Sequence, residues 1–70
     1  MKEKLKKVLK EQGVSQYELA ELLNLTYQTV SIKMNGHKDF TQSEIRGLKL
    51  ILGLTPEQID DIFFSSTIEN

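Results

Sequence analysis

Short hydrogen-bonding side chains, rather than charges, dominate the outer face of residues 27–34. At about 100° per residue on a helix, Gln28 and Ile32 point to the side opposite Val30 and Met34. The amide of Gln28 can donate and accept hydrogen bonds together, which matches the N6 and N7 edge of adenine, and an apolar side chain such as Ile32 can contact a thymine methyl group. The chemistry that this face predicts is therefore the recognition of base edges.

Two residues of this segment have a second interpretation. Ile32 can simply cover an edge of the core, because single apolar residues are common at protein surfaces. Tyr27 lies near the apolar stripe of the same segment, so partial burial beside Val30 also fits its position. The sequence leaves both alternatives open.

The sequence holds no arrangement that is typical of catalysis or metal binding. Its single histidine, His37, has no evident nucleophile or carboxylate partner, and no glycine-rich loop is present to hold a phosphate. The chain contains no cysteine, which excludes a disulfide framework and a thiolate metal site. We therefore expect no enzymatic activity, no cofactor and no bound metal.

Length and composition predict one small domain. A chain of 70 residues with 39% hydrophobic content can bury one modest core, which we expect to span residues 1–64, with residues 65–70 fraying as a tail. The apolar runs are far shorter than the roughly 18 residues of a membrane-spanning helix, and the lysine-rich start lacks the apolar stretch of a signal peptide. A cytoplasmic protein with no membrane contact is the simplest expectation.

Capping signals predict two short helices around the polar face. Ser15 and Glu18 form the pattern of a capping box, which starts the first of them. Asn24 tolerates a left-handed backbone at its end, and Thr26 can cap the helix that follows. Two short helices joined by so tight a turn have the layout of a helix-turn-helix, over about residues 15–35.

Three further helices complete the expected architecture. One spans about residues 2–12. Another begins at a capping box opened by Thr41 and ends at Gly53. The last has Thr55 as its cap and Pro56 at the first helical position, where a missing N–H is harmless. Because no strand pattern occurs in the sequence, a compact all-α domain is expected.

Charge is distributed unevenly along the chain. The net charge is −1, yet residues 1–54 hold nine Lys and Arg against six Asp and Glu, a balance of +3, and the remaining residues hold four acids. Five lysines lie in the first helix: Lys2, Lys4, Lys6, Lys7 and Lys10. These lysines can place a positive field beside a phosphate backbone, or they can form no more than a solvated helix face.

The chain resembles the phage repressor and Cro-like helix-turn-helix proteins, often called the Xre family, over about residues 4–62. The residues that carry the resemblance are Gln16, Leu19, Ala20, Leu25, Val30, Ser31, Asn35 and Gly36. It implies a compact five-helix, lambda-repressor-like DNA-binding domain. The chain departs from the family pattern at Asn24, where glycine is usual, and at Lys33, where an apolar residue is common and Met34 takes over the core role.

The resemblance also implies which residues contact DNA, with the helix 27–34 in the major groove. The base-facing positions are Tyr27, Gln28 and Ile32. The positions near the DNA backbone are Gln16, Thr29 and Asn35, and Gln16 stands at a helix N-terminus, where free N–H groups can hold a phosphate. The remaining expected contacts are Thr26, Ser31, Lys33 and Lys38, the two lysines through nonspecific attraction.

By the same resemblance, the protein is expected to be a transcriptional regulator of phage or mobile-element type that binds a palindromic operator as a homodimer. Phe64 and Ile68 are the expected dimer contacts, whereas Ile59, Ile62 and Phe63 are assigned to the core. The alternative is a protein-binding module on the same scaffold, similar to an antitoxin or antirepressor, which acts through its apolar and acidic C-terminal segment.

Overall fold

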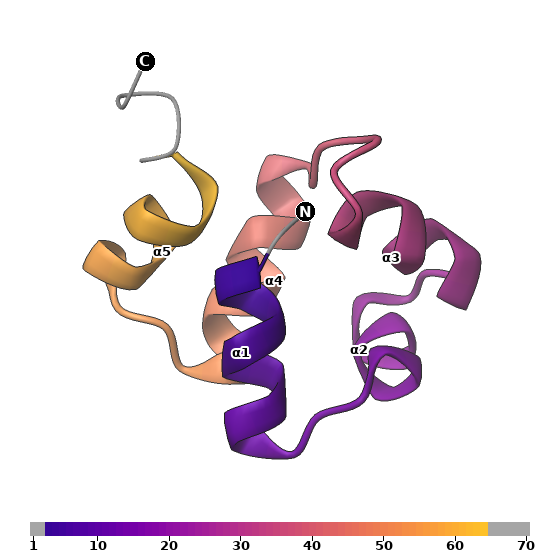
Figure 1. Ribbon diagram of the computed structural model, residues 1–70, viewed down its shortest axis with the longest axis horizontal. Coiled ribbons are helices and arrows are strands. Elements are labelled where there is room, and N and C mark those ends of the chain that lie inside the picture. The colour runs from indigo at the N-terminus through magenta and orange to yellow at the C-terminus, as the bar shows by residue number, and fades with distance from the viewer. Residues whose placement is uncertain (1–2, 65–70) are drawn as a thin grey trace.

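The computed structural model describes residues 3–64, in which α-helices follow one another and no strand occurs. The helices are α1 (Glu3–Gln12), α2 (Gln16–Leu23), α3 (Tyr27–Met34), α4 (Gln42–Leu52) and α5 (Pro56–Phe63) (Figure 1). The predicted five-helix, all-α architecture is confirmed.

Side-chain caps set the starts of α2 to α5. The predicted capping boxes of Ser15 with Glu18 and of Thr41 with Glu44 are both formed. Thr55 begins a third capping box at α5, with Pro56 at the start of that helix. Each box bonds two backbone N–H groups that the helix itself leaves without an acceptor. The starts of these helices are therefore fixed by interactions within four successive residues.

A left-handed residue ends α2 and makes the turn to α3 tight. Asn24 adopts φ 60° and ψ 42°, and its N–H donates to the carbonyl groups of Ala20 and Glu21. The N–H of Leu25 also donates to the carbonyl of Ala20, at 2.8 Å. Asparagine is one of the few residues besides glycine that adopts this conformation at low cost, so the departure from the family pattern at this position keeps the turn.

One hydrophobic core joins all the helices. Its buried residues are Leu5, Leu9, Leu19, Ala20, Val30, Met34, Phe40, Leu48, Leu52, Leu54 and Ile62. Phe40 enters the core from the loop before α4 and packs edge-on against Phe63, with ring centroids 5.9 Å apart. Leu22 shares the helical spacing of Leu19 but lies exposed to solvent. Burial on α2 is thus confined to a narrow stripe.

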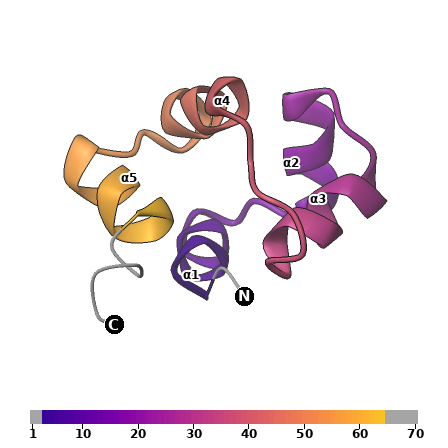
Figure 2. The same ribbon diagram turned by 90° about the horizontal axis from the view of Figure 1, so that it is seen from above.

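The helix-turn-helix pair projects from one end of the fold. Figures 1 and 2 show α2 and α3 together at one end, α5 at the other, and α1 and α4 between them. The side-chain amide of Gln12 donates to the carbonyl oxygen of Leu52 at 2.7 Å, which joins the ends of α1 and α4. Lys4 pairs with Asp61 of α5 at 2.6 Å on the surface. The central helices therefore form a base from which α2 and α3 extend.

The left-handed turn predicts a stability difference between two variants of Asn24. Asn24→Gly should stay within about 0.5 kcal/mol of the wild type, whereas Asn24→Ala should lose about 1 kcal/mol, because a Cβ group strains a left-handed backbone. Gly53→Ala is the matched control: Gly53 has φ 65° and open space where a Cβ would stand, so its loss comes from the backbone alone. Urea unfolding followed by circular dichroism measures each value. Equal stability of the two Asn24 variants would contradict the prediction.

Candidate nucleic-acid interface

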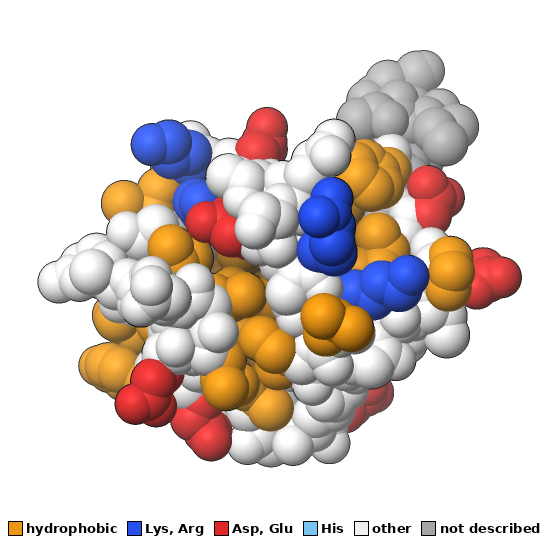
Figure 3. Space-filling model, turned by 180° about the vertical axis from the view of Figure 1, so that it is seen from behind, with side chains coloured by type: hydrophobic (Ala, Val, Ile, Leu, Met, Phe, Trp, Pro, Cys, Tyr) orange, Lys and Arg blue, Asp and Glu red, His pale blue; other side chains and the backbone are white. Residues whose placement is uncertain are grey.

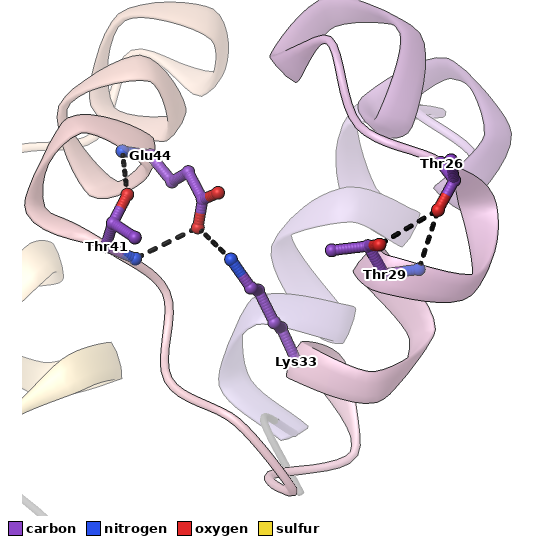
Figure 4. Close-up of polar contacts among 5 residues, drawn as sticks. All are labelled: Thr26, Thr29, Lys33, Thr41 and Glu44. Atoms are coloured by element: carbon purple, nitrogen blue, oxygen red, sulfur yellow. Dashed lines mark hydrogen bonds and ion pairs between the residues drawn. The ribbon is translucent and has the colours of Figure 1, made fainter.

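The first turn of α3 is held by two threonine side chains. The Oγ1 atom of Thr26 accepts a hydrogen bond from the N–H of Thr29 at 3.1 Å, and the two hydroxyl groups lie 2.9 Å apart (Figure 4). Both residues belong to the predicted contact set, and the structure brings them together at the N-terminus of the helix. These hydrogen bonds fix the backbone from which the side chains of Tyr27 and Gln28 project.

The outer face of α3 carries the side chains that the sequence assigns to base recognition. Val30 and Met34 are fully buried, whereas Gln28 is exposed and Ile32 keeps 46% of its surface exposed. The predicted division of the helix into a core face and an outer face is thus confirmed. Ile32 therefore leaves nearly half of its surface to solvent on the same side of α3 as Gln28.

Lys33 does not belong to the exposed set, which corrects the expectation of a nonspecific contact with DNA. Its side chain is only 8% exposed, and its Nζ atom lies 2.6 Å from Oε1 of Glu44 (Figure 4). A buried ammonium group that already has a carboxylate partner is unavailable to a phosphate. Lys33 and Met34 therefore both lie on the inner side of α3. Lys33 adds a buried ion pair there to the apolar contacts of Met34.

Glu44 combines two structural roles in one oxygen atom. Its Oε1 accepts the N–H of Thr41 at 2.9 Å, which completes the capping box of α4, and it accepts the bond from Lys33 as well. Burial of the carboxyl group acts to raise its pKa, but the bonds from Lys33 and Thr41 outweigh burial, and the pKa of Glu44 lies below its ordinary value of 4.5. The carboxylate form is therefore the form that holds α3 against α4.

A pair of aromatic rings joins the N-terminal ends of α2 and α3. Tyr17 and Tyr27 stack with ring centroids 4.1 Å apart and an angle of 15° between the ring planes. Tyr27 keeps 39% of its surface exposed, and its ring contacts Tyr17. Sequence reasoning missed Tyr17, because the two residues are on different helices and no local spacing pattern links them.

The other predicted residues lie at several places on the structure, from the start of α2 to the end of α5. Gln16 is the first residue of α2 and is half-buried, as is Ser31 of α3. Asn35, the C-cap of α3, and Lys38, in the loop that follows, are both exposed. Phe64 lies beyond α5, half-exposed and tilted against Phe63. Ile68 lies outside the described residues.

A shallow apolar groove separates α4 from α5 on the far side of the molecule. Its lining residues are Gln42, Ile45, Arg46, Lys49, Ile59 and Phe64. Figure 3 shows hydrophobic side chains beside Lys and Arg side chains over this face. Arg46 and Lys49 of this groove are separate from Lys33 of α3, which pairs with Glu44.

The fold and the site together define a helix-turn-helix DNA-binding domain, the class of domain that transcriptional regulators use. A family model described as the Cro/C1-type HTH DNA-binding domain matches residues 4–63, and the chain belongs to this family. No curated protein and no solved structure matches the chain. Within the described residues, no helix combines the length and the apolar character needed to cross a membrane.

The Lys33–Glu44 pair predicts a loss of stability in acid. The folded state keeps Glu44 charged at a pH where the unfolded chain takes up a proton, so the pair's contribution is complete above about pH 4.5 and is lost as the pH falls through the lowered pKa. Urea unfolding at a series of pH values measures this dependence. Glu44→Gln should show a weaker dependence in the same range.

A double-mutant cycle is the control for this assignment. Lys33→Met leaves Glu44 without its cation and should lower the free energy of unfolding by about 1–3 kcal/mol. Lys33→Met/Glu44→Gln should recover part of that loss, because no buried charge then lacks a partner. Strictly additive single losses would show that the two side chains do not act together.

Proposed function

We propose that the chain is a sequence-specific regulator of transcription, of the Cro or repressor type carried by phages and mobile elements, which acts in the cytoplasm and inserts α3 into the major groove of double-stranded DNA. The observation that carries this proposal is the outer face of α3. It presents Gln28 and Ile32 to solvent, while Val30 and Met34 are fully buried on the opposite side. A helix held in this way can offer the same side chains to each site it meets.

Base contacts in this proposal come from three side chains. Gln28 forms a bidentate pair with adenine, Ile32 contacts a thymine methyl group, and Tyr27 adds a third contact from the first turn of α3. A good bidentate pair contributes about 1–3 kcal/mol of discrimination against the wrong base. Few side chains would therefore determine the preferred sequence.

Contacts with the DNA backbone come from the ends of both helices. The capping box takes up the N–H of Glu18. The N–H groups of Gln16 and Tyr17 have no carbonyl one turn earlier to bond, so they and the side chain of Gln16 can hold a phosphate together. Thr26, Thr29 and Ser31 supply hydroxyl groups along α3. Asn35 and Lys38 are exposed after the helix and can contact the next phosphates.

The proposal predicts that Gln28→Ala relaxes sequence selection. Selection of bound duplexes from a random library should enrich one palindromic sequence for the wild type. Titration of that duplex should then show a loss of about 1–3 kcal/mol for Gln28→Ala, concentrated at adenine positions of each half-site. Leu50→Ala is the control, because Leu50 is 81% exposed on α4 and lies outside the groove and outside the proposed DNA contacts.

The salt dependence of DNA affinity tests the proposed phosphate contacts. Wild-type affinity should fall steeply as salt rises, because each phosphate contact releases counterions. No enriched sequence would contradict sequence-specific regulation. An enriched sequence that Gln28→Ala binds with unchanged affinity would contradict the assignment of α3 as the recognition element.

We further propose that the protein binds its palindromic operator as a homodimer through Phe64 and Ile68. Two-fold symmetric sites match two-fold symmetric proteins, and each partner then offers the same patch to the other. Phe64 supports this arrangement because 51% of its surface is exposed beside the apolar groove of α4 and α5. An aromatic side chain so placed can bury a large area against a second copy.

Dimerisation by this route predicts that Phe64→Ser weakens self-association. The wild type should sediment as a concentration-dependent monomer and dimer mixture, and Phe64→Ser should shift it to monomer, since the interface loses its aromatic contact on both sides. Leu50→Ser is the control, because Leu50 is highly exposed on α4 and outside the groove. Equal effects of both substitutions would contradict an interface centred on Phe64.

The same groove favours a second candidate function, that of a protein-binding module similar to an antitoxin or antirepressor. Apolar lining flanked by Arg46 and Lys49 matches an apolar and acidic partner surface. Binding of this kind depends mainly on apolar burial, so it should respond only weakly to salt, unlike binding to several phosphates.

A further inference from the structure

Tyr17 and Tyr27 are the only tyrosines of the chain, and they stand against each other on the surface. Their rings are nearly parallel, with centroids 4.1 Å apart. Tyr27 is the first residue of α3, and Tyr17 is the second residue of α2. The stack therefore bridges the N-terminal turn of α2 and the N-terminal turn of α3.

Burial does not explain this stack. Tyr17 keeps 69% of its surface exposed, so its ring contributes little to the core. The crossing of α2 and α3 is already packed by the buried residues Leu19, Ala20 and Val30. The contact between the two rings therefore belongs to the outer surface of α2 and α3 and not to the core.

We propose that Tyr17 is a positioning residue, which holds the ring of Tyr27 in the orientation that meets the base edges. This inference rests on the proposed function of α3. The backbone of Tyr27 is already fixed by the cap between Thr26 and Thr29. The remaining freedom of Tyr27 is the rotation of its side chain, and the ring of Tyr17 restricts that rotation before DNA arrives.

The expected benefit is preorganisation. An exposed aromatic side chain that occupies several rotamers must be fixed in one of them on binding, and this ordering lowers affinity. A ring that is already stacked avoids most of that loss. Because the restriction concerns one base-facing side chain, it should affect the selected sequence and leave attraction to the phosphates unchanged.

The test compares Tyr17→Ala and Tyr17→Phe on two duplexes, the wild-type selected sequence and an unrelated one. Tyr17→Ala should bind the selected duplex about three- to tenfold more weakly, with unchanged affinity for the unrelated duplex and an unchanged salt slope. Tyr17→Phe keeps the ring and should bind as the wild type does. Leu22→Ala is the matched control, since it removes an exposed apolar side chain from the last turn of α2.

A spectroscopic measurement separates this role from a merely structural one. In both Tyr17 variants Tyr27 is the sole tyrosine, so the tyrosine band of the near-ultraviolet circular dichroism, which lies at longer wavelength than the phenylalanine bands, reports on it alone. The signal should be strong in Tyr17→Phe, where the ring is held, and weak in Tyr17→Ala. Urea unfolding should show both variants folded, with the midpoint of Tyr17→Ala lower by no more than the loss of one exposed ring contact, because neither substitution touches the core.

Three results would overturn the inference while the proposed function stands. Tyr17→Ala could bind the selected duplex as tightly as the wild type, although Gln28→Ala loses affinity. Tyr17→Phe could lose as much as Tyr17→Ala, which would assign the effect to the hydroxyl group. Tyr17→Ala could weaken both duplexes equally and lower the salt slope, which would make Tyr17 a direct phosphate contact. A wild type that selects no sequence would overturn both proposals together.

Discussion

The ion pair between Lys33 and Glu44, together with the buried side chains of Val30 and Met34, fixes how α3 is turned about its own axis. An apolar side chain at this position could slide along the core with little loss, but a buried ammonium group must meet its carboxylate. That carboxylate is itself fixed by the N–H of Thr41 at the start of α4. The rotation of α3 is thus tied to a backbone atom of its neighbour, and the position of its outer face follows from it.

Such a constraint matters because α3 has only eight residues. Helices of this length are unstable alone, since the cost of nucleation is spread over few hydrogen bonds. The cap at Thr26 holds one end, the ion pair holds the other, and Val30 and Met34 anchor the middle in the core. Gln28 and Ile32 are held in place on the outer side of α3 by the contacts that the helix makes on its inner side.

The local signals in the sequence predicted most of the fold, because each acts over three or four residues. The capping boxes at Ser15 and Thr41 and the left-handed turn at Asn24 are of this kind, and they placed α2, α3 and α4 correctly. The burial of Lys33 could not be predicted in the same way. Its partner lies eleven residues away, and the cap of α4 already accounted for Glu44. Tyr17 was missed for the same reason, because its contact with Tyr27 depends on how two helices cross.

The pairing of Lys33 also changes how the proposed function can work. It removes one of the nine Lys and Arg of residues 1–54 from contact with phosphates but leaves their balance of +3 unchanged, because Glu44 is neutralised with Lys33. Nonspecific attraction to phosphates grows with the number of free cations, so this surface should bind random DNA weakly. Useful recognition depends on the ratio of specific to nonspecific affinity. In the proposed function, a fixed rotation of α3 and a restrained Tyr27 would raise the specific affinity, and the buried Lys33 would keep the nonspecific affinity low, so both effects would increase that ratio.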